Sequence, residues 1–305
     1  MIIIKDQIDD IIKISILNDG YIYHYTSVEA VRGIFDNEQF WATKSDFLND
    51  KMEFKYTYQL FAEHILKNIK CTGFREKLIE AFEKEIESTN EWQLAQGQSM
   101  NGYYIVSFSK DPDSLLLWTE FYDSMGYNLE FKFNTLLKSF ENKIMWHGEV
   151  VYDKETQLKY LNEALNNVIK LRPEMYNVKS IDDFDERTDH QSISYLALDL
   201  YVACTVYSMF YKQQEFEPEK EYRFVFSAIH EKNKYVLNPT KMHFRVKNDA
   251  LIPYIKVPCK PLEALNTVRI GPKNNIDIAT AGIKYYCREK KINVPIIRSG
   301  IPLRY

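Results

Sequence analysis

The chain has 305 residues, of which 45% are hydrophobic and 27% are charged, and its formal net charge is −4. This composition is typical of a folded globular protein, and the small acidic excess argues against a broad nucleic-acid surface while leaving room for a local basic groove. Glycine and proline, with ten residues each, are too scarce for long flexible linkers.

The cysteines and the N-terminal residues argue against a zinc site, a disulfide framework and a signal peptide. Cys71, Cys204, Cys259 and Cys287 stand apart without a CxxC pair, so we expect neither a zinc site nor a disulfide framework. The opening MIIIKDQIDDIIKI carries acids within its apolar pattern and lacks the features of a signal peptide. No apolar run approaches the length of a bilayer. We therefore expect a cytoplasmic protein without a membrane partner or a bound metal.

The first half of the chain alternates short strands with helices. Apolar spacing predicts a helix over residues 1–17, a strand over 21–26, a helix over 28–35 that a Thr-Ser pair can cap, and a strand over 40–45. Residues 46–56 are predicted to form a loop. Residues 52–98 are predicted to be helical, with most of their charges on a solvated face.

The middle of the chain follows the same alternation. The strand pattern returns at 102–111 and at 127–133, on either side of a helix predicted at 111–124. A further strand is expected at 143–153. Residues 155–212 are predicted to be mainly helical, with an acidic loop at 180–192.

The last third reads as strands with one helix. The expected strands cover 222–229, 243–249, 254–259 and 268–272, and the helix covers 278–291. Together the elements predict an α+β fold with mixed or antiparallel central sheets. We expect a single domain over 1–305, with helical insertions at about 52–98 and 155–212.

Three strand segments carry polar side chains of catalytic type. They are the His24 segment YIYHYT, the Ser107-Phe108-Ser109 strand and the Glu219-Lys220-Glu221 stretch that opens the strand at 222–229. Each has a plainer interpretation. His24 can be a hydrogen-bonded core residue, the two serines can belong to a turn or an edge, and the two glutamates can lie on the surface.

In this order the three segments resemble the ADP-ribosyltransferase fold, which has a His or Arg on its first strand, a Ser or Tyr on a middle strand and a Glu at the start of a late strand. The opening YHYTSVEAVRGIF also resembles the entry segment of DNA-targeting ADP-ribosyltransferase toxins and RNA 2′-phosphotransferases. The resemblance implies an ADP-ribosyltransferase-like fold with NAD as a substrate.

A second resemblance covers most of the chain. The ordered segments include FWATKSDFLND, VSFSKDPDSLLLWTEFYDS, EKEYRF, VRIGP and SGIPLR. They are similar to an uncharacterised bacterial family, domain of unknown function 2971. This resemblance implies no activity, because the function of that family is not established.

The ADP-ribosyltransferase resemblance implies roles for particular residues. Cleavage of nicotinamide from NAD passes through an oxocarbenium-like ribose, which a nearby carboxylate stabilises. Glu221 is the expected catalytic acid, with Glu219 as its competitor, and His24 is expected to donate a hydrogen bond to the ribose or to the adenosine half. The remaining contacts to NAD are expected from Tyr25, Thr26, Ser107, Ser109, Tyr122 and Arg223.

Several of these residues have alternatives. Tyr25 or Tyr122 would stack on nicotinamide, but Tyr122 lies one helical turn from Trp118 and the pair equally suits a core. Arg223 shares a strand face with Glu221, so it forms a surface ion pair or else faces a phosphate or Asp50. Asn49, Asp50 and Glu53 suit either a helix cap or oxygen ligands of a cation.

Two main functions follow as expectations. The first is an NAD-consuming ADP-ribosyltransferase or glycohydrolase-like enzyme with a protein or nucleic-acid acceptor, and bacterial conflict or phage defence is its expected setting. The second is a non-catalytic module that binds a nucleotide or a partner protein. A nuclease built on Asp50, Glu53 and Glu221 around a divalent metal is a third option. Oligomerisation is compatible with all three.

Overall fold

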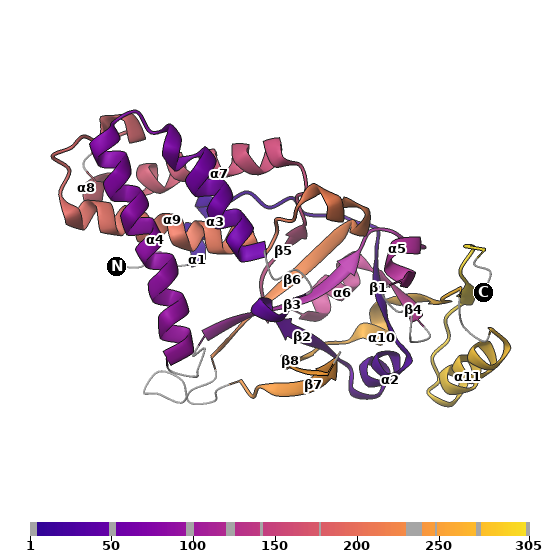
Figure 1. Cartoon of the computed structure of the whole chain (residues 1–305). Coiled ribbons are helices and arrows are strands. Elements are labelled where there is room, and N and C mark those ends of the chain that lie inside the picture. The colour runs from indigo at the N-terminus through magenta and orange to yellow at the C-terminus, as the bar shows by residue number, and fades with distance from the viewer. Residues whose placement is uncertain are drawn as a thin grey trace. The chain divides into compact units, whose positions relative to one another are not determined.

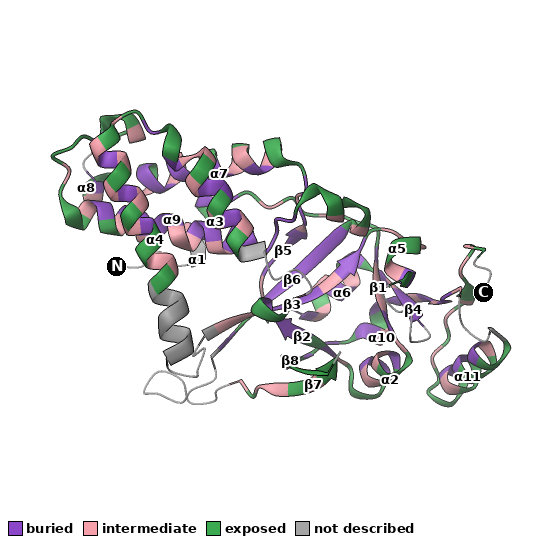
Figure 2. Cartoon of the chain, in the orientation of Figure 1, coloured by how far each residue is buried: buried purple, intermediate pink, exposed green. Residues whose placement is uncertain are grey.

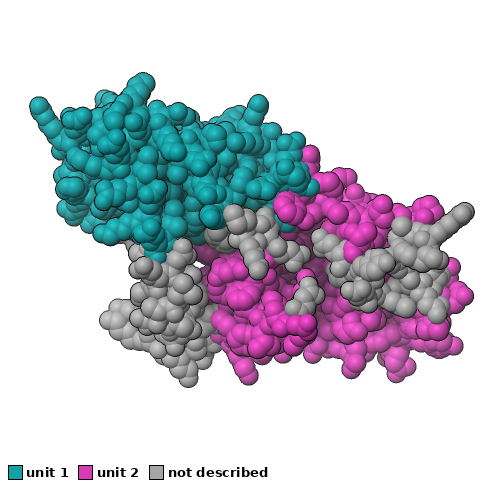
Figure 3. All heavy atoms as spheres, viewed as in Figure 1, with its two compact units in different colours: residues 1–14, 49–100, 151–215 teal, residues 15–48, 101–150, 216–305 magenta. Residues whose placement is uncertain are grey.

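The helical and the strand-rich segments of the chain form two separate groups of elements in the computed structural model, which describes residues 5–48, 53–95, 101–119, 126–140, 143–176, 178–229, 240–247, 249–272 and 276–302. One compact unit contains residues 1–14, 49–100 and 151–215, and the other contains 15–48, 101–150 and 216–305 (Figure 3). Both expected helical insertions lie in the first unit. The expectation of a single domain stays a prediction.

The first unit is helical because its segments carry apolar residues at helical spacing. Its helices are α1 (Lys5–Ile11), α3 (Glu53–His64), α4 (Thr72–Ala95), α7 (Lys154–Leu171), α8 (Pro173–Tyr176) and α9 (His190–Ser208) (Figure 1). Short 3₁₀ turns occupy Leu66–Asn68 and Ile181–Asp183.

Helix α9 is the centre of this unit. It packs against α3, α4 and α7 and buries residues around most of its circumference, including Leu196, Leu200 and Cys204 (Figure 2). The aspartates at the starts of α7 and α9 accept a hydrogen bond from the backbone three residues on, Asp153 from Thr156 and Asp189 from Ser192. These caps satisfy amides that the helix itself leaves without a partner.

The second unit is built on a mostly antiparallel open sheet. Its strands are β1 (Tyr21–Ser27), β2 (Gln39–Lys44), β3 (Asn101–Ser109), β4 (Gly126–Lys132), β5 (Ile144–Glu149), β6 (Glu221–Ile229), β7 (His243–Lys247), β8 (Ala250–Pro258), β9 (Leu265–Ile270) and β10 (Ile296–Arg298). The order along the sheet is β10-β9-β4-β1-β3-β2-β8-β7, and β6 lies between β3 and β5. Only the β9–β10 pair is parallel among the named strand pairs of the described residues.

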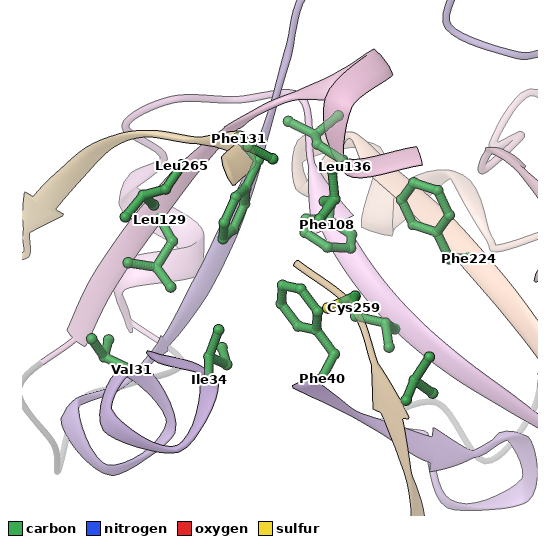
Figure 4. Packing of buried hydrophobic residues seen from close by; sticks show 14 of the residues in the cluster. Val31, Ile34, Phe40, Phe108, Leu129, Phe131, Leu136, Phe224, Cys259 and Leu265 are labelled. Carbon is green, nitrogen blue, oxygen red and sulfur yellow. The ribbon is translucent and has the colours of Figure 1, made fainter. Parts of the chain in front are cut away.

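The hydrophobic core of this unit covers one face of the sheet. Helices α2 (Val28–Asn37), α6 (Phe133–Phe140), α10 (Pro261–Ala264) and α11 (Ile276–Glu289) contribute to it. Phe40, Phe108 and Phe131 lie at its centre, with ring centroids 5.5 to 6.2 Å apart (Figure 4). Such edge-to-face packing is the preferred geometry of aromatic pairs.

The predicted α+β class is confirmed, and the differences lie at element ends. The helix expected over residues 1–17 ends at Ile11, and Ser15 instead accepts a backbone hydrogen bond from Glu149. The strand expected over 143–153 ends at Glu149, because Asp153 caps α7. The helix expected at 111–124 is described only as α5 (Leu115–Thr119).

Candidate functional site

Three strands bring the predicted site segments to one end of the sheet. Tyr23 of β1 pairs with Ser109 of β3, and Ser109 pairs on its other side with Glu221 of β6. His24 is the next residue after Tyr23. The chain therefore places His24, Ser109 and Glu221 on three neighbouring strands, although almost two hundred positions separate the first from the last.

The sheet forks at this end of β3. In the described part of the sheet, β1 pairs with β3 at Tyr23–Ser109 alone, and β2 pairs with the same side of β3 only at Thr43–Ile105 and Lys44–Tyr104. Between these two points the β3 backbone meets a side chain instead of a strand. His24 Nδ1 lies 3.0 Å from the Ser107 carbonyl oxygen. We call this region, defined by His24, Ser107 and Ser109, the fork.

Strand alternation separates the predicted residues onto two faces. Phe108 and Tyr222 are opposite each other on the core face, so Ser109 and Glu221 project from the other face. The His24 ring contacts Phe40 and Phe108 at centroid distances of 5.3 and 5.2 Å, which places it on the core side. The structure thus brings the serines and Glu221 together on one face, with the imidazole on the other side of the fork.

His24 is half-buried, and the loss of water around its ring favours the neutral form. Removal from water lowers the pKa of its imidazole to about 4, and the positive charge of Arg245 acts in the same direction. A carbonyl oxygen only accepts, so Nδ1 carries the proton and donates to Ser107. Nε2 is then an acceptor. The expectation that His24 donates a hydrogen bond to a ligand is therefore corrected: in this state it can only accept one.

Glu221 and Arg223 form a buried ion pair. Arg223 Nη2 lies 2.8 Å from Glu221 Oε2, and the side chains are 1% and 9% exposed. The alternative of a surface ion pair is wrong, because both side chains are almost completely shielded from solvent. A carboxylate paired this closely with a guanidinium is held in its ionised form. Asp50, the other expected partner of Arg223, lies outside the described residues.

The structure also separates the two competing glutamates. Glu221 is the first residue of β6, whereas Glu219 ends the 3₁₀ turn Gln214–Glu219. Lys220 between them has a positive φ of 46°, which turns the chain at this point. Glu221 therefore has the strand position that the transferase resemblance implies for the catalytic acid.

Ser109 supports the turn at the end of β3. Its hydroxyl donates to the Glu219 carbonyl at 2.7 Å and accepts from the Asp111 amide at 3.0 Å. Both hydrogen bonds go to backbone groups, one in the turn before β6 and one in the loop after β3. Ser107 reaches the fork through its carbonyl.

Tyr25 forms hydrogen bonds and ring contacts within the protein, and Thr26 is buried. The Tyr25 hydroxyl donates to the Asp111 carbonyl and accepts from the Ser114 amide, both at 2.8 Å. Its ring packs edge-on against Trp118 at 4.8 Å. Burial raises the pKa of the Tyr25 hydroxyl. Thr26 is buried at 6% exposure. Tyr122, the other expected nicotinamide contact, lies outside the described residues.

Asp113 forms a polar centre that sequence reasoning missed. Its carboxylate accepts from the Trp118 indole, the Ser299 hydroxyl and the Gly300 amide, each at 2.7 Å. Arg269 lies 3.7 Å away. The sequence offered only a Pro-Asp-Ser stretch, which suits a helix start. Trp118 is local, but Arg269 and the Ser299-Gly300 pair come from two distant segments that no pattern around Asp113 predicts.

Gly271 shows why the Ile-Gly-Pro turn needs its glycine. A Cβ atom here would lie 2.8 Å from the Gly126 carbonyl oxygen and 3.0 Å from the Trp118 ring. The same residue donates a backbone hydrogen bond to Gly126. The Leu-Trp helix, the Ile-Gly-Pro turn and the Ser-Gly pair therefore meet at Asp113. This centre holds the loop after β3, and so the position of Tyr25.

The last candidate features are ligands for a metal ion and helices that could cross a membrane. Asn49 and Asp50 lie outside them, as does the side chain of Glu53. Among the described side chains, no group of three or more His, Cys, Asp or Glu residues is arranged to hold a metal ion. The four cysteines are free. No described helix combines the length and the apolar character needed to cross a bilayer.

Comparison with known proteins identifies a family and no activity. Neither a curated protein nor a solved structure matches the chain. The matched family region includes Glu221 and Arg223, and it ends before most of β6. Residues 117–224 match the model of the family described as "Protein of unknown function (DUF2971)", which supports the resemblance that the sequence motifs indicate.

Proposed function

We propose that the second unit is an ADP-ribosyltransferase-like domain that consumes NAD, either as an ADP-ribosyltransferase or as an NAD glycohydrolase. One observation carries the proposal. Strands β1, β3 and β6 are neighbours, and His24, Ser109 and Glu221 lie within one residue of a single row across them. The order of residue types along these strands is the one that the transferase resemblance implies.

Glu221 supplies the charge that the reaction needs. When the bond between nicotinamide and ribose breaks, positive charge develops on the sugar, and a carboxylate at ~4 Å stabilises it by roughly 4 kcal/mol at an effective dielectric constant of about 20. An effect of this size confined to the transition state corresponds to about a thousandfold in rate. Arg223 Nη2 lies 2.8 Å from this carboxylate, and such a pair favours the charged form of the acid.

His24 would act from the other side of the fork. Its neutral ring presents Nε2 as an acceptor, so it suits a ribose hydroxyl as donor. The sugar would then lie at the fork, where the β3 backbone is next to a side chain rather than a strand. Ser109, Tyr25 and Asp113 would hold the surrounding loop in place.

The test is release of nicotinamide from NAD by the purified protein, with and without candidate protein and nucleic-acid acceptors. Glu221→Gln keeps the size of the side chain and removes its charge, so we expect a loss of about a thousandfold. Glu217→Gln, an exposed glutamate in the preceding turn, is the matched control. Melting temperatures of both variants separate loss of activity from loss of folding. No release by the wild-type protein would refute the proposal.

Expression in bacteria gives a second readout. If NAD consumption serves defence or toxicity, the wild-type chain slows growth, and Glu221→Gln relieves the effect while Glu217→Gln does not. Equal growth with all three chains would leave no support for a toxic activity.

A second function is a nucleotide- or partner-binding module without catalysis. The buried pair of Glu221 with Arg223 favours it, because the acid already has a counterion. Thermal shift with NAD and ADP-ribose is the discriminating measurement, since a ligand at a hundredfold excess over its Kd stabilises the protein by about 2.7 kcal/mol. Stabilisation without nicotinamide release selects this function over the first.

A further inference from the structure

The strands at one end of the sheet gather cations and aromatic rings on a single face. Register pairs His243 with Tyr254, and Tyr254 with Thr43 of β2. Trp41 pairs with Lys256 in the same way. Because side chains of paired residues project to the same side, these residues share one face. We call Trp41, His243, Arg245, Lys247, Tyr254 and Lys256 the basic–aromatic face.

Three rings form a continuous stack across this face. Trp41 stacks on Tyr254 with centroids 4.5 Å apart and planes 24° from parallel, and His243 stacks on Tyr254 at 5.5 Å and 27°. Tyr254 is only 6% exposed, whereas Trp41 is 37% exposed. The indole therefore keeps a surface open for one more flat group.

Cations surround the stack. Arg245 donates to the Thr43 hydroxyl at 2.7 Å, and its guanidinium lies 6.0 Å from the centre of the Tyr254 ring. Lys256 and Lys241 are close enough to help burial lower the pKa of His243. Neither Arg245 nor Lys256 forms an ion pair with an acid that the structure describes. Asp249, exposed at the turn before β8, is the nearby carboxylate along this hairpin.

The opposite face of the β7–β8 hairpin has a different character. Phe244, Val246 and Leu251 project there and are 58 to 73% exposed. By strand register, the cations and these apolar residues are thus on opposite sides of the hairpin. A membrane surface would be expected to need both on one side, with apolar groups inserted beneath basic ones. This separation argues for a water-exposed polyanion as the partner of the basic–aromatic face.

We propose that the basic–aromatic face binds single-stranded nucleic acid, with a base stacked on Trp41 and phosphates beside Arg245 and Lys256. Proteins bind single strands by two interactions together: bases stack on exposed aromatic rings, and cationic side chains contact the phosphate backbone of the nucleic acid. Paired bases are already stacked in a duplex, so a duplex would use the cations alone. Because the chain as a whole has a net charge of −4, attraction of phosphates requires a local basic surface such as this face. The proposal is independent of NAD chemistry.

The test is fluorescence anisotropy of a labelled mixed-sequence oligonucleotide of about 15 nucleotides, as DNA and as RNA, at several salt concentrations. We expect Trp41→Leu to weaken binding about tenfold through loss of base stacking. Tyr285→Leu is the matched control, because Tyr285 is an aromatic residue 64% exposed on α11. Lys256→Gln should reduce the slope of log affinity against log salt by about 0.7, with Lys138→Gln on α6 as its control.

The possible results decide between distinct partners. Absence of binding at 50 mM salt, equal binding of a duplex of the same length, or equal effects of the Trp41 and Tyr285 substitutions would each overturn the proposal. Melting temperatures identify a variant that does not fold, and the exposed Lys256 provides a variant that leaves the core untouched. The binding measurement contains no NAD, so failure of the NAD proposal leaves this result unchanged.

Discussion

His24 shows at the scale of one residue how burial decides chemistry. An aromatic strand containing a histidine is compatible with a ligand contact or with the core, and the structure has the ring packed on two phenylalanines while one nitrogen is bonded to a backbone carbonyl. The pKa of about 4 follows mainly from the loss of water around the ring. Its chemistry is therefore that of a neutral acceptor.

The first prediction concerns the pH dependence of stability. The pKa of His24 is about 4 in the folded chain and 6.5 in the unfolded one, so the unfolded state binds more protons between these values. The contribution of a neutral His24 is complete above pH 6.5 and is lost as the pH falls toward 4. We expect the stability of the wild type to fall faster than that of His24→Gln over this range.

Urea unfolding at pH 7 and at steps down to pH 4 measures this difference. His190→Gln, at an exposed histidine of α9, is the control for the loss of one titrating group. His147 is also buried in part and has a lowered pKa, so the comparison must be between the wild type and the variant rather than between two pH values. Parallel pH profiles for the wild type and His24→Gln would contradict the assignment.

At the scale of elements, the end of β3 joins several segments through one hydroxyl. Ser109 bonds the turn before β6 and the loop after β3 at the same time. The strand pattern of GYYIVSFS predicted β3 well, because alternating and apolar residues set its period. The hydrogen-bond partners of Ser109 depend on which strand lies beside β3. The Ser-x-Ser motif alone does not predict that neighbour.

The second prediction is that Ser109 acts on stability. Ser109→Ala removes two hydrogen bonds at a residue that is 3% exposed, so we expect a loss of about 1–3 kcal/mol in the free energy of unfolding. Ser107→Ala, two residues earlier on the same face, is the matched control. Thermal or urea unfolding of both variants makes the measurement. Equal stability of the two would show that the turn does not depend on this hydroxyl.

At the scale of the whole molecule, each unit is assembled from segments that are distant in the chain. The helical unit contains residues 1–14, 49–100 and 151–215, so two long excursions of the chain leave it and return. Helix α1 belongs to it and packs against α7. Ile8 and Ile11 are 2% and 1% exposed, and the Lys13 amide donates to the Tyr207 hydroxyl at 3.0 Å.

The third prediction follows from this assembly. Ile11→Ala leaves a cavity at a position where the N-terminal segment completes the helical core, and we expect the free energy of unfolding to fall by about 2–5 kcal/mol. Asp10→Ala, at the exposed neighbouring residue, is the control. Urea unfolding followed by circular dichroism of the helices measures both. A small effect of Ile11→Ala would show that the first helix adds little to this unit.

Local patterns in the sequence predicted the α+β class and the positions of most strands and helices, and its motifs resemble the DUF2971 family, whose model matches residues 117–224. Periodicity and recurring motifs are local properties of the chain, and they carry this information whatever the tertiary contacts are. The sequence also allowed the pairing of Glu221 with Arg223 to be predicted, because residues two apart on a strand share a face.

Tertiary structure alone decided which segments meet and on which face. The row Tyr23–Ser109–Glu221, the placement of His24 on the core side, the Asp113 centre and the basic–aromatic face all depend on strand register between distant segments. A shift of one residue in register would exchange the two faces of a strand. That choice is made by the burial of the phenylalanine core as a whole, and no single segment of the sequence contains it.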